Sequence, residues 1–189
     1  FAFTTRVQSD LSKAALHIVG RDGLTKIRFT VQGNFAGEAK LSQNGDYVLV
    51  KYNETTSTAL GQPSVYNRQG TLIKQYAGYS DYAWLPDGRI ALTKEDSIYL
   101  ASSDFGEPVL LTQIAEERPS SLSPSPDGKF IAFMLGRTPQ TPTDGSVNMI
   151  KIDGTGLRQV AVADYGVEGA GWSPDGQHLV LRSPLVYDA

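Results

Sequence analysis

A serine hydrolase site is the first chemistry to test, because the stretch GYSDY at 78–82 places a serine between a glycine and an acid. A nucleophile elbow needs the pattern G-x-S-x-G at a strand-to-helix turn. This stretch lacks the second glycine, and no helical pattern follows it. The two histidines of the chain, His17 and His178, fall in predicted strands of different repeat units. We therefore predict no Ser-His-Asp triad, and no catalytic residue is assigned.

Metal and cofactor sites are the next possibility, since Asp87, Asp127 and Asp175 could act as ligands or as acid–base groups. Each of these carboxylates recurs at the same place in a repeated turn, so turn chemistry explains them better. The chain has no H-E-x-x-H motif, no phosphate loop and no calcium loop. Cysteine is absent, which excludes disulfides and thiol catalysis. We predict neither a metal nor a cofactor.

The composition excludes two classes of partner. Of the 189 residues, 40% are hydrophobic and 20% are charged, and the formal net charge is -3. No block of Lys and Arg is present, so we do not expect nucleic acid to bind. No apolar run approaches the roughly 18 residues that would span a bilayer, so we do not expect membrane insertion.

Glycines mark two series of turns; the first recurs every 40–48 residues and the second every 36–48 residues. In Ser-Pro-Asp-Gly at 125–128, proline presets the second position of a type I turn, aspartate suits the third, and glycine takes the left-handed position that follows. Such a turn joins two antiparallel strands. The first series ends at Gly45, Gly88, Gly128 and Gly176, and the second at Gly23, Gly70, Gly106 and Gly154.

Short apolar runs follow the first-series turns, as in KFIAFML after Gly128. Near-continuous apolar character indicates strands covered on both faces, and no segment has a sustained helical period. Each unit therefore contains four antiparallel strands, which is typical of a β-propeller blade. We predict an all-β chain that forms one partial propeller of three whole blades and two partial ones. The expected blades span 1–32 (partial), 38–76, 81–113, 120–163 and 168–189 (partial).

The runs WLPDGRIALT at 84–93 and WSPDGQHLVL at 172–181 resemble the WD-repeat-like propeller repeats of TolB-like proteins. SPDGKFIAFM at 125–134 is similar, and MIKIDGTGLRQV at 149–160 resembles the later turn of that repeat. Gln43-Asn44 depart from the Pro-Asp pair. We expect the tryptophans to fill the wedge between blades and the Pro-Asp-Gly triplets to form turns. These structural repeat residues are Trp84, Pro86, Asp87, Gly88, Pro126, Asp127, Gly128, Trp172, Pro174, Asp175 and Gly176.

The loops between blades gather on one rim of such a fold, and loops on a rigid scaffold often carry function. They are rich in aromatic and acidic residues, which suits the recognition of a protein, a peptide or a basic ligand. Ordinary solvated loops are the competing interpretation. The candidate binding residues are Phe35, Glu38, Tyr79, Asp81, Glu116, Glu117, Arg118, Asp164, Tyr165 and Glu168.

Three functions stay open. The first is a non-enzymatic, TolB-like binding module, for which the resemblance implies a periplasmic or other exported bacterial setting. The second is the gating propeller of a prolyl-oligopeptidase-family peptidase, with the catalytic domain outside this sequence. The third, a lactonase-like propeller with a channel-bound metal, ranks last because the inner strands supply few carboxylates. The partial blades leave open ends, which we expect missing blades or an oligomer partner to cover.

Overall fold

The structure, a computed structural model, describes residues 2–6, 13–24, 26–32, 34–35, 39–53, 62–115, 117–136, 145–163 and 169–182. The described chain divides into two compact units, Phe1–Ser80 and Asp81–Ala189. All the elements assigned in the described residues are β-strands. No helix in these residues is long or apolar enough to cross a membrane.

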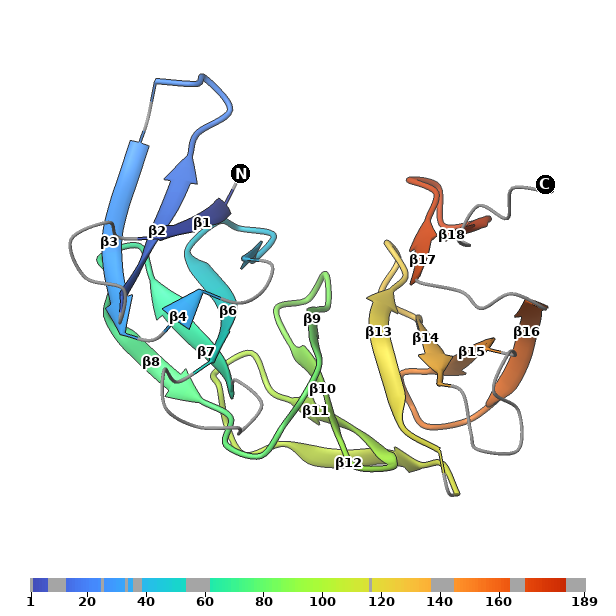
Figure 1. The fold of residues 1–189 in the computed structure, drawn as a ribbon. Helices are drawn as coiled ribbons and strands as arrows, with labels where there is room; N and C mark the ends of the chain where they lie inside the picture. Colours follow the sequence, from blue (N-terminus) through green and yellow to red (C-terminus); the bar gives the residue numbers. More distant parts are fainter. Residues whose placement is uncertain are drawn as a thin grey trace, which may run out of the picture. The chain divides into compact units, whose positions relative to one another are not determined.

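The first unit holds two antiparallel sheets, coloured blue to green in Figure 1. The first sheet has the order β1-β2-β3. In the second sheet β4 and β5 both pair with β6, which pairs in turn with β7, and β7 with β8. The strands are β1 (Ala2–Arg6), β2 (Lys13–Val19), β3 (Lys26–Gln32), β4 (Asn34–Phe35), β5 (Lys40–Leu41), β6 (Tyr47–Asn53), β7 (Gln62–Asn67) and β8 (Leu72–Gln75).

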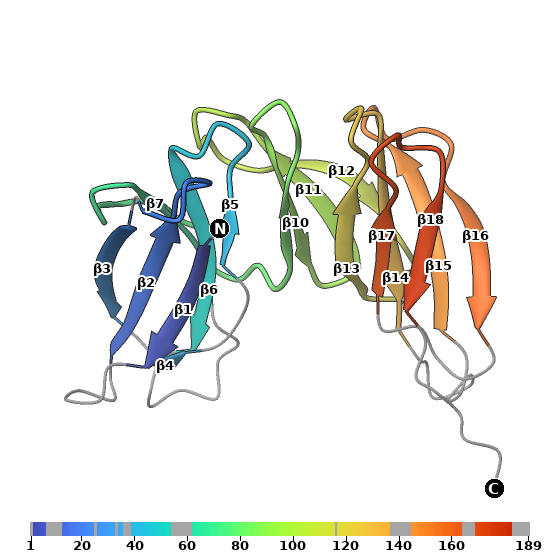
Figure 2. The same cartoon turned by 90° about the horizontal axis from the view of Figure 1, so that it is seen from above.

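The second unit holds a third, a fourth and a fifth sheet. The third and fourth are four-stranded, in the orders β9-β10-β11-β12 and β13-β14-β15-β16, and the fifth is the pair β17-β18. Within this unit β17 lies beside β13, as Figure 2 shows. The strands are β9 (Tyr82–Trp84), β10 (Ile90–Lys94), β11 (Ser97–Ala101), β12 (Val109–Gln113), β13 (Pro119–Pro124), β14 (Phe130–Leu135), β15 (Gly145–Lys151), β16 (Arg158–Ala163), β17 (Gly169–Trp172) and β18 (Leu179–Arg182).

The apolar cores lie between neighbouring sheets inside each unit. In the second unit one cluster joins Ala83 and Ile98 of the third sheet to Ile131 and Phe133 of the fourth. In the first unit Leu16 of the first sheet packs in a cluster that includes residues of β6. The second strands of the third and fourth sheets, β10 and β14, are buried on both faces, which explains their near-continuous apolar sequence. The predicted all-β architecture of four-stranded antiparallel sheets with partial sheets is confirmed.

The glycine turns follow the predicted chemistry with one exception. The first-series glycines have φ between +68° and +88°, and Gly23, Gly70 and Gly154 of the second series have φ between +69° and +85°. At SDFG the prediction is wrong, because Phe105, with φ of 65°, takes the left-handed position instead of Gly106. A Cβ on Gly106 would lie 2.8 Å from Ser102 Oγ. A side chain at this position would therefore require the Ser102 hydroxyl to move.

Candidate functional site

Each sheet has two chemically different ends. We call the end of a sheet at which its last strand ends the rim end, and the described candidates Tyr79, Asp81, Glu117 and Arg118 lie at this end of their own sheets. The two series of glycine turns lie at the opposite end, which we call the turn end. The two ends use their polar side chains in different ways.

Asp81 is a rim residue whose carboxylate is already engaged within the protein. Its backbone N–H donates to Thr93 Oγ1 at 2.9 Å, and the Thr93 N–H donates back to the Asp81 carbonyl oxygen at 3.0 Å. The Oδ2 atom accepts the backbone N–H of Leu122 at 2.9 Å. Because Leu122 belongs to β13, this bond ties the third sheet to the fourth.

The segment that Asp81 holds is an irregular part of β13. The pairing of β13 with β14 shifts register between Ser120 and Ser123, which is a β-bulge. Ser121 lies inside it with φ of 52°. From the other side, Trp172 Nε1 of β17 donates to the Ser123 carbonyl oxygen at 2.8 Å. Trp172 therefore contacts a neighbouring sheet, whereas Trp84 packs edge-on against Phe105 of its own sheet, with ring centroids 6.2 Å apart.

The loop after β8 carries Tyr79 in the first unit. The half-buried Tyr79 ring meets Tyr76 edge-on, with centroids 6.3 Å apart and an angle of 84° between the rings. Lys74 Nζ lies 5.8 Å from the centre of the Tyr76 ring. Lys51 Nζ donates to the Ser80 carbonyl oxygen at 2.6 Å. Two lysines that the sequence analysis did not consider therefore accompany this tyrosine pair.

Glu117 and Arg118 lie at the entry to β13, where Glu117 is half-buried and Arg118 is exposed. Within the described part of the chain, neither side chain forms a hydrogen bond or ion pair. The structure places the backbone of Phe35 in β4, opposite Tyr52 of β6, and does not describe its side chain. The remaining candidates lie outside the described residues: Glu38, Glu116, Asp164, Tyr165 and Glu168.

At the turn end, the repeated aspartates hold the turns. Asp127 Oδ1 accepts the Ser125 hydroxyl at 2.6 Å and the Lys129 N–H at 3.0 Å. Ser125 Oγ in turn accepts the Phe130 N–H at 2.9 Å. The Ser125 hydroxyl, followed by the Lys129 N–H, lowers the pKa of the Asp127 carboxyl. The carboxylate therefore serves the turn, as does Asp175 with Ser173.

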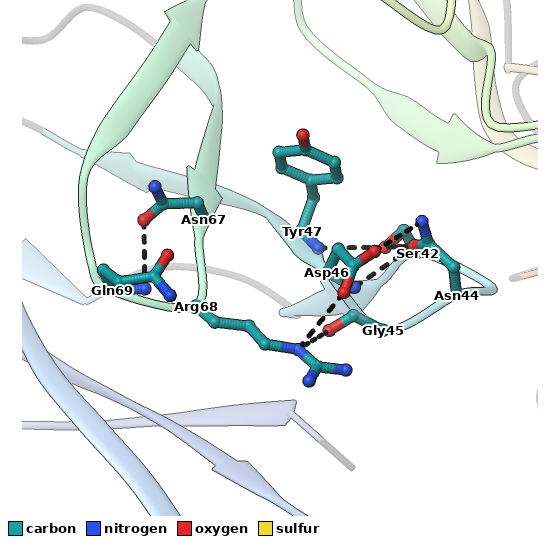
Figure 3. Close-up of polar contacts among 8 residues, drawn as sticks. All are labelled: Ser42, Asn44, Gly45, Asp46, Tyr47, Asn67, Arg68 and Gln69. Atoms are coloured by element: carbon teal, nitrogen blue, oxygen red, sulfur yellow. Dashed lines mark hydrogen bonds and ion pairs between the residues drawn. The ribbon is translucent and has the colours of Figure 1, made fainter.

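The second sheet, whose turn lacks Pro-Asp, uses a different set of contacts, shown in Figure 3. Asn44 Oδ1 accepts the Ser42 hydroxyl at 2.8 Å, as aspartate does elsewhere. Arg68, from the second turn of the same sheet, reaches across: its Nε donates to the Gly45 carbonyl oxygen at 2.7 Å and lies 3.5 Å from Asp46 Oδ1. An arginine bridge between two turns thus accompanies the departure from the repeat.

The sequence analysis missed the role of the serines that precede the first-series turns. Ser42, Ser125 and Ser173 each stand three positions before a first-series glycine. Each hydroxyl donates to the Asn or Asp two residues later and accepts a backbone N–H five residues later. Their recurrence at a fixed distance from the glycine could have revealed this role. The third sheet departs, with Leu85 buried at this position.

The histidines are not arranged for catalysis. His17 stacks on Phe3 at 4.8 Å, and its Nε2 lies 2.9 Å from Thr5 Oγ1. Burial lowers the pKa of His17, and the charge of Arg28 lowers it further. His178 lies in the turn before β18 and not in a strand, 3.9 Å from Asp175. Among the described residues no group of three or more His, Cys, Asp or Glu side chains gathers to hold a metal.

Comparison by sequence gives no match to this chain, either among protein-family models or among curated proteins. Comparison of folds gives clear matches. A chain assigned as a TolB from Agrobacterium tumefaciens matches with a TM-score of 0.64 and 18% identity, over 88% of this chain and 62% of that one. TolB from Acinetobacter baumannii matches with a TM-score of 0.57 and 15% identity, over 95% of this chain and 50% of that one. The chain has a β-propeller fold. The five sheets are its whole and partial blades, and the resemblance to TolB propellers is one of fold.

Two propellers of other classes match as well. The nidogen/laminin complex matches with a TM-score of 0.66 and 13% identity, over 96% of this chain and 69% of that one. A serine-to-alanine variant of puromycin hydrolase, complexed with PGG, matches with a TM-score of 0.65 and 15% identity, over 95% of this chain and 33% of that one. The chain thus spans less than two thirds of the length of both TolB chains and a third of the hydrolase. At these identities the likeness concerns the propeller fold alone.

Proposed function

We propose that this chain is a non-enzymatic binding module, and that it takes a protein or peptide through the rim end of its blades. The observation that carries the proposal is the contrast between the two ends of the fourth blade. At the turn end, Ser125 and Asp127 are engaged in the bonds of the turn itself. At the rim end, Arg118 is exposed and forms no hydrogen bond or ion pair within the described part of the chain. Such a group is available to a partner.

Two further points support binding over catalysis. The described residues contain neither a Ser-His-Asp arrangement nor a cluster of metal ligands. One of the matching propellers comes from the structure of a nidogen/laminin complex, and this supports protein recognition as the function to test. The likeness to TolB also motivates an exported or periplasmic setting as part of the proposal.

The test begins with peptides selected on the whole chain from a random display library. Affinities are then measured for the wild type, Tyr79→Ala and Arg118→Ala. Lys129→Ala is the matched control, because it removes one cation from the turn end of the same blade that carries Arg118. We expect each rim variant to weaken binding about tenfold, the loss of one contact of about 1.4 kcal/mol. Equal affinities for all four proteins, with each variant folded, would contradict a rim site.

The gating propeller of a serine peptidase is the second candidate, favoured by the match to puromycin hydrolase over 33% of that chain. Under this alternative the propeller covers a separate hydrolase domain. The sequence of the parent protein discriminates between the two. A downstream α/β-hydrolase segment with G-x-S-x-G supports the peptidase, and its absence from the complete parent sequence rules this alternative out.

A further inference from the structure

Ser121 is the most unusual residue of the rim end. Positive φ is uncommon for a residue with a side chain. Of the described non-glycine residues with positive φ, Glu95 and Phe105 lie in tight turns, and Ser121 alone lies inside a strand. A strained backbone that persists in a regular element is a reason to look for a function.

The bulge around Ser121 is held in place from both sides. Asp81 accepts the Leu122 N–H at 2.9 Å, and Trp172 donates to the Ser123 carbonyl oxygen at 2.8 Å. These two bonds come from the blades before and after it. The pairing of β9 with β10, and of β17 with β18, shows no register shift, so the bulge is a local feature of β13. The protein therefore commits two side chains to keeping this segment irregular.

Three residues with hydrogen-bond donors follow one another closely in the sequence at the entry to β13 and its bulge. Ser120 is exposed, Ser121 is half-buried, and Arg118 is exposed two residues before Ser120. Within the described part of the chain, none of these three side chains forms a hydrogen bond or ion pair. At the turn end of the same blade, by contrast, the Ser125 hydroxyl donates to Asp127.

Two hydroxyl donors and a guanidinium suit a carboxylate. A carboxylate accepts hydrogen bonds only, and arginine binds it with charge-assisted, often paired bonds. We infer that the bulge at 120–123, together with Arg118, is the point at which the rim binds the carboxylate of a peptide partner. The inference rests on the proposed binding function and names the chemical group that the partner presents. Asp81 and Trp172 are positioning residues in this proposal, because they hold the backbone of the bulge. The serines and Arg118 bind the ligand.

The test uses N-acetyl-tetra-alanine with a free carboxyl terminus, and the same peptide with a terminal carboxamide as the uncharged probe. Each is titrated into the whole chain, and amide chemical shifts are followed by NMR. We expect the free-acid peptide to shift the amides of Arg118 and of residues 120–123, and the carboxamide to leave them unchanged. Arg118→Ala and Ser121→Ala should each raise the dissociation constant at least fivefold. Lys129→Ala, which removes a turn-end cation, should leave it unchanged.

The variant Ser121→Gly separates the effect of the serine on ligand binding from its effect on the stability of the strand. Glycine adopts positive φ without strain, so this variant should melt about 2–4 °C higher than the wild type. It lacks the hydroxyl, so it should bind as weakly as Ser121→Ala. A variant that is both more stable and weaker in binding shows that the strained serine serves the ligand.

Two results would overturn the inference. One is that the free-acid peptide and its carboxamide produce equal shifts, or that neither produces any. The other is that Arg118→Ala and Ser121→Ala bind the free acid as the wild type does. The proposed binding function fails separately: it fails when no selected library peptide depends on any rim residue. It survives when selected peptides depend on Tyr79 but not on residues 118–123.

Discussion

Gly154 provides a quantitative test of how the third and fourth blades fit together. It has φ of +85°, and a Cβ placed on it would lie 2.9 Å from the backbone carbonyl oxygen of Leu111 in β12. Gly128 also has positive φ, +68°, but a Cβ there would lie 3.6 Å from Pro86 Cδ, an ordinary contact. Alanine at either position enters left-handed backbone. The difference between the two variants therefore measures mainly the contact with Leu111.

The expected magnitudes follow from three terms. Left-handed backbone costs a residue such as alanine about 1–2 kcal/mol. About 0.4–1 kcal/mol of this is offset, because alanine restricts the unfolded chain more than glycine does. Gly128→Ala should therefore lower the free energy of unfolding by about 1 kcal/mol. Gly154→Ala must also displace a backbone atom, and forced shifts in packed regions cost about 1–3 kcal/mol, so its total should be about 2–4 kcal/mol.

Urea unfolding followed by tryptophan fluorescence is the suitable assay. Trp84 and Trp172 are the two tryptophans of the chain, and both lie in the second unit with Gly128 and Gly154. The midpoint should fall further for Gly154→Ala while the slope with denaturant stays that of the wild type. Losses that agree within about 0.5 kcal/mol, the usual additivity error, would refute the argument from close contact. A larger loss for Gly128→Ala would refute it more strongly.

Three further predictions concern single hydrogen bonds. Ser125→Ala should raise the pKa of Asp127 towards its ordinary value, as measured by an NMR titration of the carboxyl carbon. A carboxyl whose pKa is lowered in the folded state adds stability above its ordinary pKa, and this stability is lost as the pH falls through the folded-state pKa. The loss of stability below about pH 4 should therefore be smaller in the variant than in the wild type. Asp81→Ala should speed hydrogen exchange of the Leu122 amide, because it removes the oxygen that accepts this N–H. Asp81→Asn keeps an acceptor oxygen and should retain most of the protection. Equal exchange rates in the wild type and both variants would rule out the bond. Trp172→Phe should lower the free energy of unfolding, measured by circular dichroism, by about 0.5–1.5 kcal/mol for the lost bond, and no loss would mean that the indole N–H contributes nothing.

The architecture could be predicted from the sequence because its signals are local. A Pro-Asp-Gly triplet such as 126–128 determines its own turn, since proline restricts φ and glycine accepts the left-handed position. Those turns, placed between short apolar runs, leave few arrangements other than repeated antiparallel sheets. Even the departure at Gln43-Asn44 keeps the turn, because the asparagine oxygen accepts the same serine hydroxyl that aspartate accepts elsewhere.

The contacts of the site could not be predicted, because they join residues far apart in the chain. Asp81 was expected to face a partner, yet its carboxylate binds the backbone of Leu122, 41 residues later. The bulge that exposes this N–H has no turn motif in the sequence PSSLSP. The left-handed Phe105 was missed for a different and local reason: the adjacent Gly106 appeared to be the left-handed turn residue, but Phe105 takes that conformation.

The turn glycines explain why we propose recognition at the rim end of the blades and not at the turn end. Gly128 lies against Pro86 and Gly176 against Pro126, each with a built Cβ 3.6 Å from the proline, so each of these two turns contacts the turn of the preceding blade. A substitution in one turn therefore disturbs two blades. At the rim end Arg118 is exposed and forms no hydrogen bond or ion pair within the described residues, so we expect its substitution to have little effect on folding. Variants of the turn end should thus alter stability and leave binding intact, and variants of exposed rim residues should do the reverse.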